Sequence, residues 1–275
     1  RSIVRRHLVP AFGDIRVDAV GALEIDRFKA SQLRDGKSPK TVSNHLTCLR
    51  RALTCAVEWG YIDRVPTVRW LKTPPPSFAF LTAEEGAALV RATPEQHRTM
   101  VLTALRTGLR CGELLGLKWG DVDFQSRKLI VRRSRWKQHD TSPKNGRARE
   151  VPMSPELERA LRGHRHLRGD YVFCKDDGRP LTRDMVKRIL PAACRRAGLK
   201  EVVQFHSLRH SFASQLVMAG KSLKVVQELL GHQSIEMTMR YAHLAPSVHA
   251  DAVAALDGPA ESGHYLGTGE KSMPK

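Results

Sequence analysis

Between residues 20 and 60, apolar residues recur every three or four positions, which is the spacing of one face of an α-helix. The clearest apolar stripe consists of Val42, Leu46, Leu49, Leu53 and Val57. Ser38 places a capping hydroxyl directly before Pro39 at the first helical position, and Gly60 stands where such a helix would end. The pattern therefore predicts helices across residues 20–60.

A proline-rich stretch then interrupts the helical pattern. Pro66 is followed by Lys72-Thr73-Pro74-Pro75-Pro76, and consecutive prolines hold a chain stiff and extended. We expect an interdomain linker over residues 64–80. A new helix is predicted after it, because Thr82-Ala83-Glu84-Glu85 fits a capping box.

Residues 121–152 have the pattern of short strands separated by polar turns. The predicted strands lie at Val122 to Phe124, at Leu129 to Val131 and at Val151 to Met153. The residues from Arg135 to Arg147 are expected to form a loop. After Thr182 helices return, with predicted ends at Gly198, Gly220 and Gly231. Pro191 is expected to kink or split its helix.

These patterns predict a mainly α fold with a small β-sheet, in the α+β class. We expect one domain at residues 1–72, a second at residues 80–256, and a disordered tail rich in Gly, Ser and Lys at residues 257–275. The first residue is Arg1 rather than Met, so the first domain is expected to be truncated at its N-terminus.

The charge of the chain points to a polyanionic partner. The formal net charge is +18, of which +7 lies in residues 1–72. Basic charge in both parts favours a nucleic acid held from two sides, although a solvated basic surface would have the same composition. No apolar run approaches the roughly 18 residues of a membrane span, and the five cysteines form no C-x-x-C pair. We therefore expect a cytoplasmic protein with reduced thiols that makes no membrane contact.

Two other motifs are weak. Gly220-Lys221-Ser222 resembles the end of a phosphate-binding loop, but Gln215 stands where the leading Gly is needed. His206 and His210 have the spacing of metal ligands on a helix, but no third ligand is evident. We expect neither a nucleotide nor a metal, and no other cofactor.

Three segments carry the chemistry. They are Thr107-Gly108-Leu109-Arg110-Cys111-Gly112-Glu113, then His206-Ser207-Leu208-Arg209-His210, and finally Gly231-His232 followed nine residues later by Tyr241. In this order the chain resembles the tyrosine recombinases, or phage integrases. The resemblance covers nearly the whole chain, and Ser38-Pro39-Lys40-Thr41-Val42 resembles the clearest stretch of the family's helical core-binding domain.

The resemblance implies cleavage and rejoining of DNA through a 3′-phosphotyrosine link to Tyr241. Planar guanidinium groups stabilise the charge that develops on phosphate oxygens, which suits Arg110 and Arg209. His206 lies one helical turn before Arg209 and is expected to act as a base or hydrogen-bond donor toward the nucleophile. His232 is expected to donate to a phosphate oxygen. We further expect nearby cations to favour the Tyr241 phenolate.

The resemblance also implies a catalytic lysine on a hairpin. Lys144 fits best, in Pro143-Lys144-Asn145-Gly146-Arg147 ahead of Val151-Pro152-Met153. Lys137 competes for the same role and Lys128 is a distant third. Glu113, one turn after Arg110, is expected to orient that arginine.

A fold of this family implies a C-shaped clamp around double-stranded DNA, formed by a SAM-like core-binding domain and a catalytic domain. Lys40, Arg50 and Arg51 lie off the apolar stripe and are expected to face the DNA backbone. The resemblance also implies a monomer in solution and a tetramer on paired sites, in which the segment from Leu244 to Leu256 would dock on a neighbouring protomer. Accessory DNA-bending proteins are further expected partners.

The expected function is site-specific integration or excision of a mobile element, such as a viral genome. Two alternatives remain: a topoisomerase of the type IB class that only relaxes supercoils, and a catalytically decayed DNA-binding relative.

Overall fold

The computed structural model describes residues 2–72, 78–136, 139–141, 146–201 and 203–246. By its internal contacts the chain divides into two compact units, residues 1–77 and residues 78–275. No helix in the described parts of the chain combines the length and the apolar character that crossing a membrane requires.

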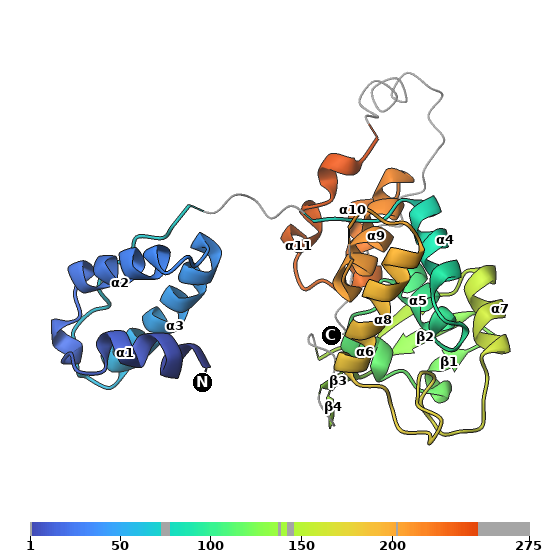
Figure 1. The fold of residues 1–275 in the computed structure, drawn as a ribbon, viewed down its shortest axis with the longest axis horizontal. Coiled ribbons are helices and arrows are strands. Elements are labelled where there is room, and N and C mark those ends of the chain that lie inside the picture. Colours follow the sequence, from blue (N-terminus) through green and yellow to red (C-terminus); the bar gives the residue numbers. More distant parts are fainter. Residues whose placement is uncertain (1, 73–77, 137–138, 142–145, 202, 247–275) are drawn as a thin grey trace, which may run out of the picture. The chain divides into compact units, whose positions relative to one another are not determined.

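The first unit is entirely helical in its described part (Figure 1). Its elements are η1 (Val4–Leu8), α1 (Val9–Phe12), η2 (Val17–Ala19), α2 (Ala22–Arg34) and α3 (Pro39–Glu58). The apolar stripe of α3 packs on α2 through a core that includes Ile25, Phe28, Val42 and Leu46. The predicted helices over residues 20–60 are confirmed, and so is the cap, since Ser38 Oγ accepts a hydrogen bond from the Thr41 amide at 3.2 Å.

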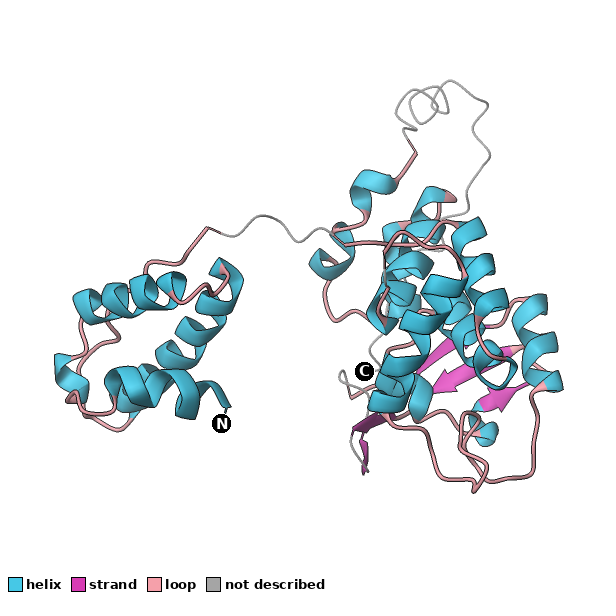
Figure 2. Cartoon of the chain, in the orientation of Figure 1, coloured by secondary structure: helices cyan, strands magenta, loops and turns pink. Residues whose placement is uncertain are grey.

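The second unit combines helices with short strands (Figure 2). Its helices are α4 (Ala83–Ala92), α5 (Glu95–Thr107), α6 (Cys111–Leu115), η3 (Trp119–Asp121), α7 (Pro155–Gly163), α8 (Arg183–Arg196), α9 (Phe205–Met218), α10 (Leu223–Leu230), α11 (Glu236–Met239) and η4 (Ala242–Leu244). Its strands are β1 (Val122–Asp123), β2 (Lys128–Val131), β3 (Ser134–Trp136), β4 (His139–Thr141) and β5 (Arg149–Pro152). The mainly α fold with small sheets is confirmed.

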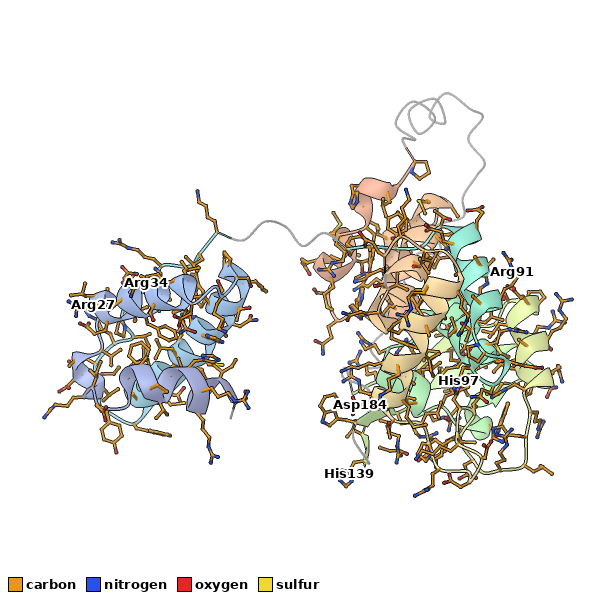
Figure 3. All side chains as sticks on the ribbon, viewed as in Figure 1. Arg27, Arg34, Arg91, His97, His139 and Asp184 are labelled. Carbon is orange, nitrogen blue, oxygen red and sulfur yellow. The ribbon has the colours of Figure 1, made fainter. Side chains whose placement is uncertain are left out.

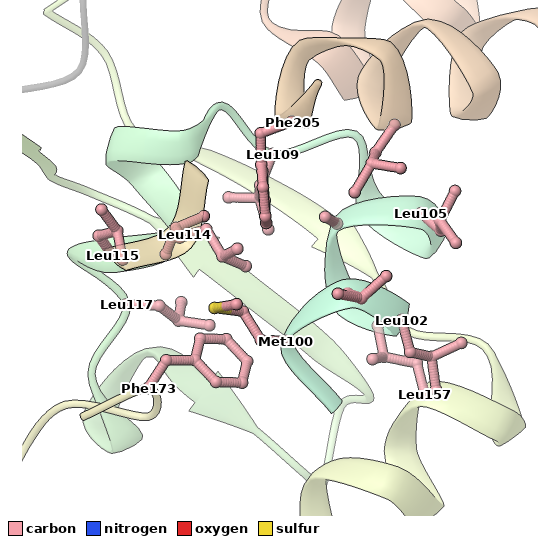
Figure 4. Packing of buried hydrophobic residues seen from close by; sticks show 14 of the residues in the cluster. Met100, Leu102, Leu105, Leu109, Leu114, Leu115, Leu117, Leu157, Phe173 and Phe205 are labelled. Carbon is pink, nitrogen blue, oxygen red and sulfur yellow. The ribbon is translucent and has the colours of Figure 1, made fainter. Parts of the chain in front are cut away.

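The strands form two antiparallel sheets. In the larger one the order is β1-β2-β5, with Leu129 opposite both Val122 and Val151. Its inward-facing side chains join the main core, which includes Met100, Leu102 and Leu105 of α5; Leu102 lies beside Leu157 of α7 (Figure 4). Burial of these apolar side chains is the main term that holds the unit together.

Two local predictions need correction. The stretch from Arg135 to Arg147 is not simply a loop, because β3 and β4 pair in register there, with Arg135 opposite Asp140. Pro191 does not split its helix, since α8 runs through it. The predicted helix ends are confirmed, since Gly198, Gly220 and Gly231 all adopt positive φ after their helices.

Basic side chains are exposed on both units. Arg27 and Arg34 on α2, and Arg91 on α4, are three labelled examples (Figure 3). Lys40, Arg50 and Arg51 are likewise exposed on α3, and Arg51 pairs with Glu58 at 3.2 Å. The positive charge of the sequence is therefore displayed at the surface of each unit.

Candidate active site

A cavity of about 270 Å³ in the second unit collects the chemistry-bearing side chains. It is lined by Arg110, His206, Arg209, His210, His232, Gln233, Met237, Arg240 and Tyr241. Five of the six expected catalytic residues thus meet in one place. The sixth, Lys144, lies outside the described residues, as does its competitor Lys137. Lys128 is described, and its ammonium pairs with Glu150 at 3.0 Å.

Arg110 enters the cavity from the turn between α5 and α6. Gly108 ends α5 with φ 61°, and a Cβ there would lie 2.5 Å from the Phe212 ring, so the close approach requires glycine. Arg110 Nη1 donates to Glu113 Oε1 at 2.9 Å, and Nη2 donates to the Gly231 carbonyl at 3.3 Å. The expected contact between Arg110 and Glu113 is therefore present.

A second arginine, Arg149 on β5, holds the other side of Glu113. Its Nη1 and Nη2 donate to the two carboxylate oxygens at 3.0 and 2.7 Å, and its Nε donates to the Leu229 carbonyl at 3.0 Å. Burial alone would raise the pKa of Glu113, but the hydrogen bonds and charge of Arg149, helped by Arg110, lower it to about 2. Sequence reasoning missed this role, because Arg149 stood in a run of nine basic residues.

Arg209 lies at the floor of the cavity on α9, with 2% of its surface exposed. Its guanidinium donates to the Gly108 and Leu230 carbonyls, each at 2.7 Å. These carbonyls belong to the C-terminal ends of α5 and α10, where the helix dipole is negative. Burial and the charge of Arg110 lower the pKa of Arg209 to about 9, so it remains charged at neutral pH.

His232 follows the C-terminus of α10. Its Nδ1 lies 2.8 Å from Thr238 Oγ1. Burial, followed by the charges of Arg209 and Arg110, lowers its pKa to about 3, so the ring is neutral. In the tautomer in which Nδ1 accepts from the threonine hydroxyl, Nε2 carries the proton and can donate it to a phosphate oxygen.

Tyr241 has only 1% of its surface exposed, although it lines the cavity. The Phe78 ring packs edge-on against the Tyr241 ring, with 5.1 Å between the ring centroids. The Tyr241 Oη lies 2.7 Å from His210 Nδ1. The prediction that nearby cations favour the Tyr241 phenolate is wrong for the protein without DNA. Burial raises the pKa of Tyr241, and this effect outweighs the charges of Arg209 and Arg240, which lower it.

The partner of the nucleophile also differs from expectation. The sequence predicts that His206 faces Tyr241, but the histidine at hydrogen-bond distance is His210, which the sequence singles out only by its metal-like spacing from His206. His206 instead packs its ring edge-on against His210 at 4.7 Å. The one-turn spacing of His206 to Arg209 could not reveal which histidine ring approaches the Tyr241 hydroxyl.

The comparison with known families decides the class of protein. The family described as "Phage integrase family" matches residues 79–247, which is more than half of the chain. The chain belongs to the phage integrase family. It is a tyrosine-type site-specific recombinase, and nothing in the comparisons supports the topoisomerase or the non-catalytic alternative.

Its relatives include recombinases of phages and bacteria. The integrase of Salmonella phage P22 is 32% identical over 79% of this chain and 57% of its own length. A XerC-like tyrosine recombinase of Caldanaerobacter subterraneus is 28% identical over 88% of this chain and 72% of its own length.

Among solved structures, the Tn1549 transposon integrase in complex with a circular intermediate DNA superposes with a TM-score of 0.79 at 22% identity. It covers 93% of this chain and 92% of its own. A lambda integrase dimer bound to a core site gives 0.72 at 23% identity, covering 88% of this chain and 86% of its own. These likenesses establish the fold of the recombinase.

Proposed function

We propose that this recombinase cuts one DNA strand through attack of Tyr241 on a phosphodiester, which leaves a 3′-phosphotyrosine link and a free 5′ hydroxyl. The observation that carries the proposal is that Arg110, Arg209 and Tyr241 line the same cavity. A phosphate bound between the two guanidinium groups would have its phosphorus within reach of the phenol. The link stores the energy of the broken bond, so rejoining needs no nucleotide cofactor.

The two arginines would stabilise the pentacovalent transition state. Both are held rigidly, Arg110 by Glu113 and Arg209 by two helix-end carbonyls, so little reorganisation accompanies the reaction. Arg110 keeps a more exposed side chain than Arg209, with 23% of its surface accessible. His232 would donate its Nε2 proton to a non-bridging oxygen, and His206, which is exposed and lines the cavity, would bind the same phosphate.

Lys144 would be the acid that protonates the leaving 5′ oxygen. It follows β4 on the basic stretch that leads into β5, and β5 contributes Arg149 to the site. An alkoxide leaves poorly unless it is protonated as its bond breaks, and a positioned acid typically contributes about 10²–10⁴-fold.

The substrate would be double-stranded DNA at paired attachment sites. The solved relatives are described as bound to DNA, one lambda integrase as a dimer on a core site and another as a tetramer on a Holliday junction. For this chain we propose a monomer in solution, a tetramer on paired sites, and a clamp in which residues 1–72 bind DNA through Lys40, Arg50 and Arg51.

The biological reaction would be integration or excision of a mobile element in the cytoplasm of a bacterial cell, with DNA-bending proteins as accessories. Relatives from phages P22 and P2 and from transposon Tn1549 favour such an element. The C-terminal segment from Leu244 to Leu256, most of which lies outside the described residues, would dock on a neighbouring protomer.

The test is a covalent-adduct assay on a nicked duplex that carries an attachment site, in which the cleaved end diffuses away and traps the enzyme on DNA. Tyr241→Phe should bind the duplex like the wild type and form no adduct. Tyr265→Phe is the control and should form adduct normally. Adduct formed by Tyr241→Phe but not by Tyr265→Phe would overturn the assignment.

A further inference from the structure

The hydroxyl of Tyr241 is already engaged with a proton acceptor. His210 Nδ1 lies 2.7 Å from Tyr241 Oη, and 7% of the surface of His210 is exposed. Two rings hold the imidazole of His210. Phe78 stacks on it, with 4.8 Å between the ring centroids and 23° between the planes, and His206 packs edge-on against it with 4.7 Å between the centroids. A short hydrogen bond to a rigid ring is the arrangement that a proton transfer requires.

The direction of this hydrogen bond follows from the charge states. Burial raises the pKa of Tyr241, so the phenol keeps its proton. Burial, followed by His206, Arg240 and Arg209, lowers the pKa of His210 to about 4, so the imidazole is neutral at pH 7. The phenol therefore donates and Nδ1 accepts, with the imidazole proton on Nε2.

We propose that His210 is a catalytic residue, the general base that takes the proton from Tyr241 as it attacks phosphorus and returns it when the strand is rejoined. The inference rests on Tyr241 being the nucleophile. In cleavage the Oη–H and P–O5′ bonds break while the Nδ1–H and Oη–P bonds form, and a separate acid protonates O5′. In rejoining the 5′ hydroxyl attacks, and the imidazolium returns the proton to the departing phenol.

Substrate binding would switch this base on. The groups that face His210 are His206 and Arg209 from α9, and Arg240 and Tyr241 after α11. The cationic charges among them disfavour an imidazolium in the empty cavity. A phosphodiester bound between Arg110 and Arg209 adds a negative charge that offsets them, which raises the pKa of His210. Tyr241 would then be deprotonated only with DNA in place.

The first arm of the test separates proton transfer from positioning. His210→Gln retains an oxygen that can accept a hydrogen bond from Tyr241 but that cannot be protonated at working pH. Single-turnover cleavage of the nicked duplex should slow by about 10²–10⁴-fold, with unchanged DNA affinity. The cleavage rate of His210→Gln should rise in proportion to hydroxide concentration over the pH range in which the wild-type rate does not change. Wild-type cleavage by His210→Gln would overturn the proposal.

The second arm uses a more acidic nucleophile, which needs less help from a base. Fluorotyrosine placed at position 241 should accelerate His210→Gln strongly and the wild type little. His206→Gln is the matched comparison and should show no such gain. If fluorotyrosine accelerates His206→Gln instead, the base is His206. Because Tyr241→Phe abolishes adduct in either case, failure here is distinct from failure of the nucleophile assignment.

A third measurement separates the base from the acid. Replacing the bridging 5′ oxygen of the substrate by sulfur creates a leaving group that departs without protonation. This substrate should leave the defect of His210→Gln in place, because the missing step lies on the attacking side. Full rescue by sulfur would assign His210 to the leaving group and contradict the proposal.

Discussion

Arg149 holds both oxygens of the Glu113 carboxylate, with Nη1–Oε1 at 3.0 Å and Nη2–Oε2 at 2.7 Å. The same carboxylate accepts from the side chain and from the backbone amide of Arg110. Glu113 therefore ties a strand of the sheet to the arginine that enters the cavity. None of the Glu113 side chain and only 12% of that of Arg149 is exposed, so the pair is held away from solvent.

Glu113→Gln should destabilise the recombinase strongly. The amide cannot balance two guanidinium charges, and removing one partner of a buried ion pair typically costs about 3–5 kcal/mol. Urea unfolding followed by circular dichroism measures the change. Glu228→Gln is the control, because its pair with Lys224 is exposed and should contribute less than about 0.5 kcal/mol. Equal stabilities of the two variants would contradict the structural role of Glu113.

Stability should fall as the solution becomes acidic, beginning below about pH 6.5. The folded pKa of His232 is about 3, against about 6.5 in an unfolded chain, so the unfolded state binds more protons between these values. The contribution of neutral His232 to the free energy of unfolding is complete above pH 6.5 and is lost as the pH falls toward about 3. His232→Gln should therefore show a shallower decline of unfolding free energy between pH 6.5 and pH 4. A decline parallel to that of the wild type would contradict the lowered pKa.

Cleavage should proceed in excess chelator. Arg110 and Arg209 supply the positive charge that a metal ion would otherwise bring to the phosphate, and both are held in place by protein groups. The rate of adduct formation with and without EDTA measures this. Activity lost with EDTA and restored by Mg²⁺ or Zn²⁺ would instead support a metal at His206 and His210.

DNA affinity should depend steeply on salt. A clamp that makes about 6–10 phosphate contacts loses about 10³–10⁵ in affinity between 50 and 200 mM salt, because each neutralised phosphate releases counterions. Residues 1–72 and residues 80–275, expressed separately, should each bind more weakly than the whole chain. A flat salt response of the intact recombinase would contradict the two-sided grip.

The sequence predicted those features that depend on residues close together along the chain. In the stripe of α3, the cap at Ser38 and the capping box at Thr82, each residue lies about one helical turn from its neighbour in the pattern, where spacing determines geometry. The strands at Val122, Leu129 and Val151 were recognised by the same local rule. The pairing of β3 with β4 was not predictable from apolar spacing, because both strands are short and carry few apolar residues; only the family resemblance implied a hairpin in this part of the chain.

Contacts between distant segments were not predictable in the same way. Arg149 is 36 residues from Glu113, and Tyr241 is 31 residues from His210. Motif order assigned Arg110, Arg209 and Tyr241 to one site, but it could not indicate that Tyr241 is buried against Phe78. Because the Tyr241 phenol is buried, its pKa is raised rather than lowered. The sequence could not predict this, since the burial depends on how distant segments pack.

Lys144 and Lys137 both lie outside the described residues, so chemistry must distinguish them. Loss of a general acid slows only the departure of the 5′ oxygen, whereas loss of an arginine removes charge stabilisation. Lys144→Ala should therefore slow cleavage by about 10²–10⁴-fold while DNA affinity stays nearly unchanged. Lys137→Ala is the matched control, and it should cleave at close to the wild-type rate.

The decisive measurement compares each variant on two substrates, one with a bridging 5′ oxygen and one with a bridging 5′ sulfur. A thiolate leaves without a proton, so the sulfur substrate should restore most of the rate to Lys144→Ala. It should not restore Arg110→Ala, whose missing charge is needed with either leaving group. Rescue of Lys137→Ala in place of Lys144→Ala would assign the acid to Lys137. If sulfur rescues neither lysine variant, the proton comes from another group, and His206, which lines the cavity, is the next to test.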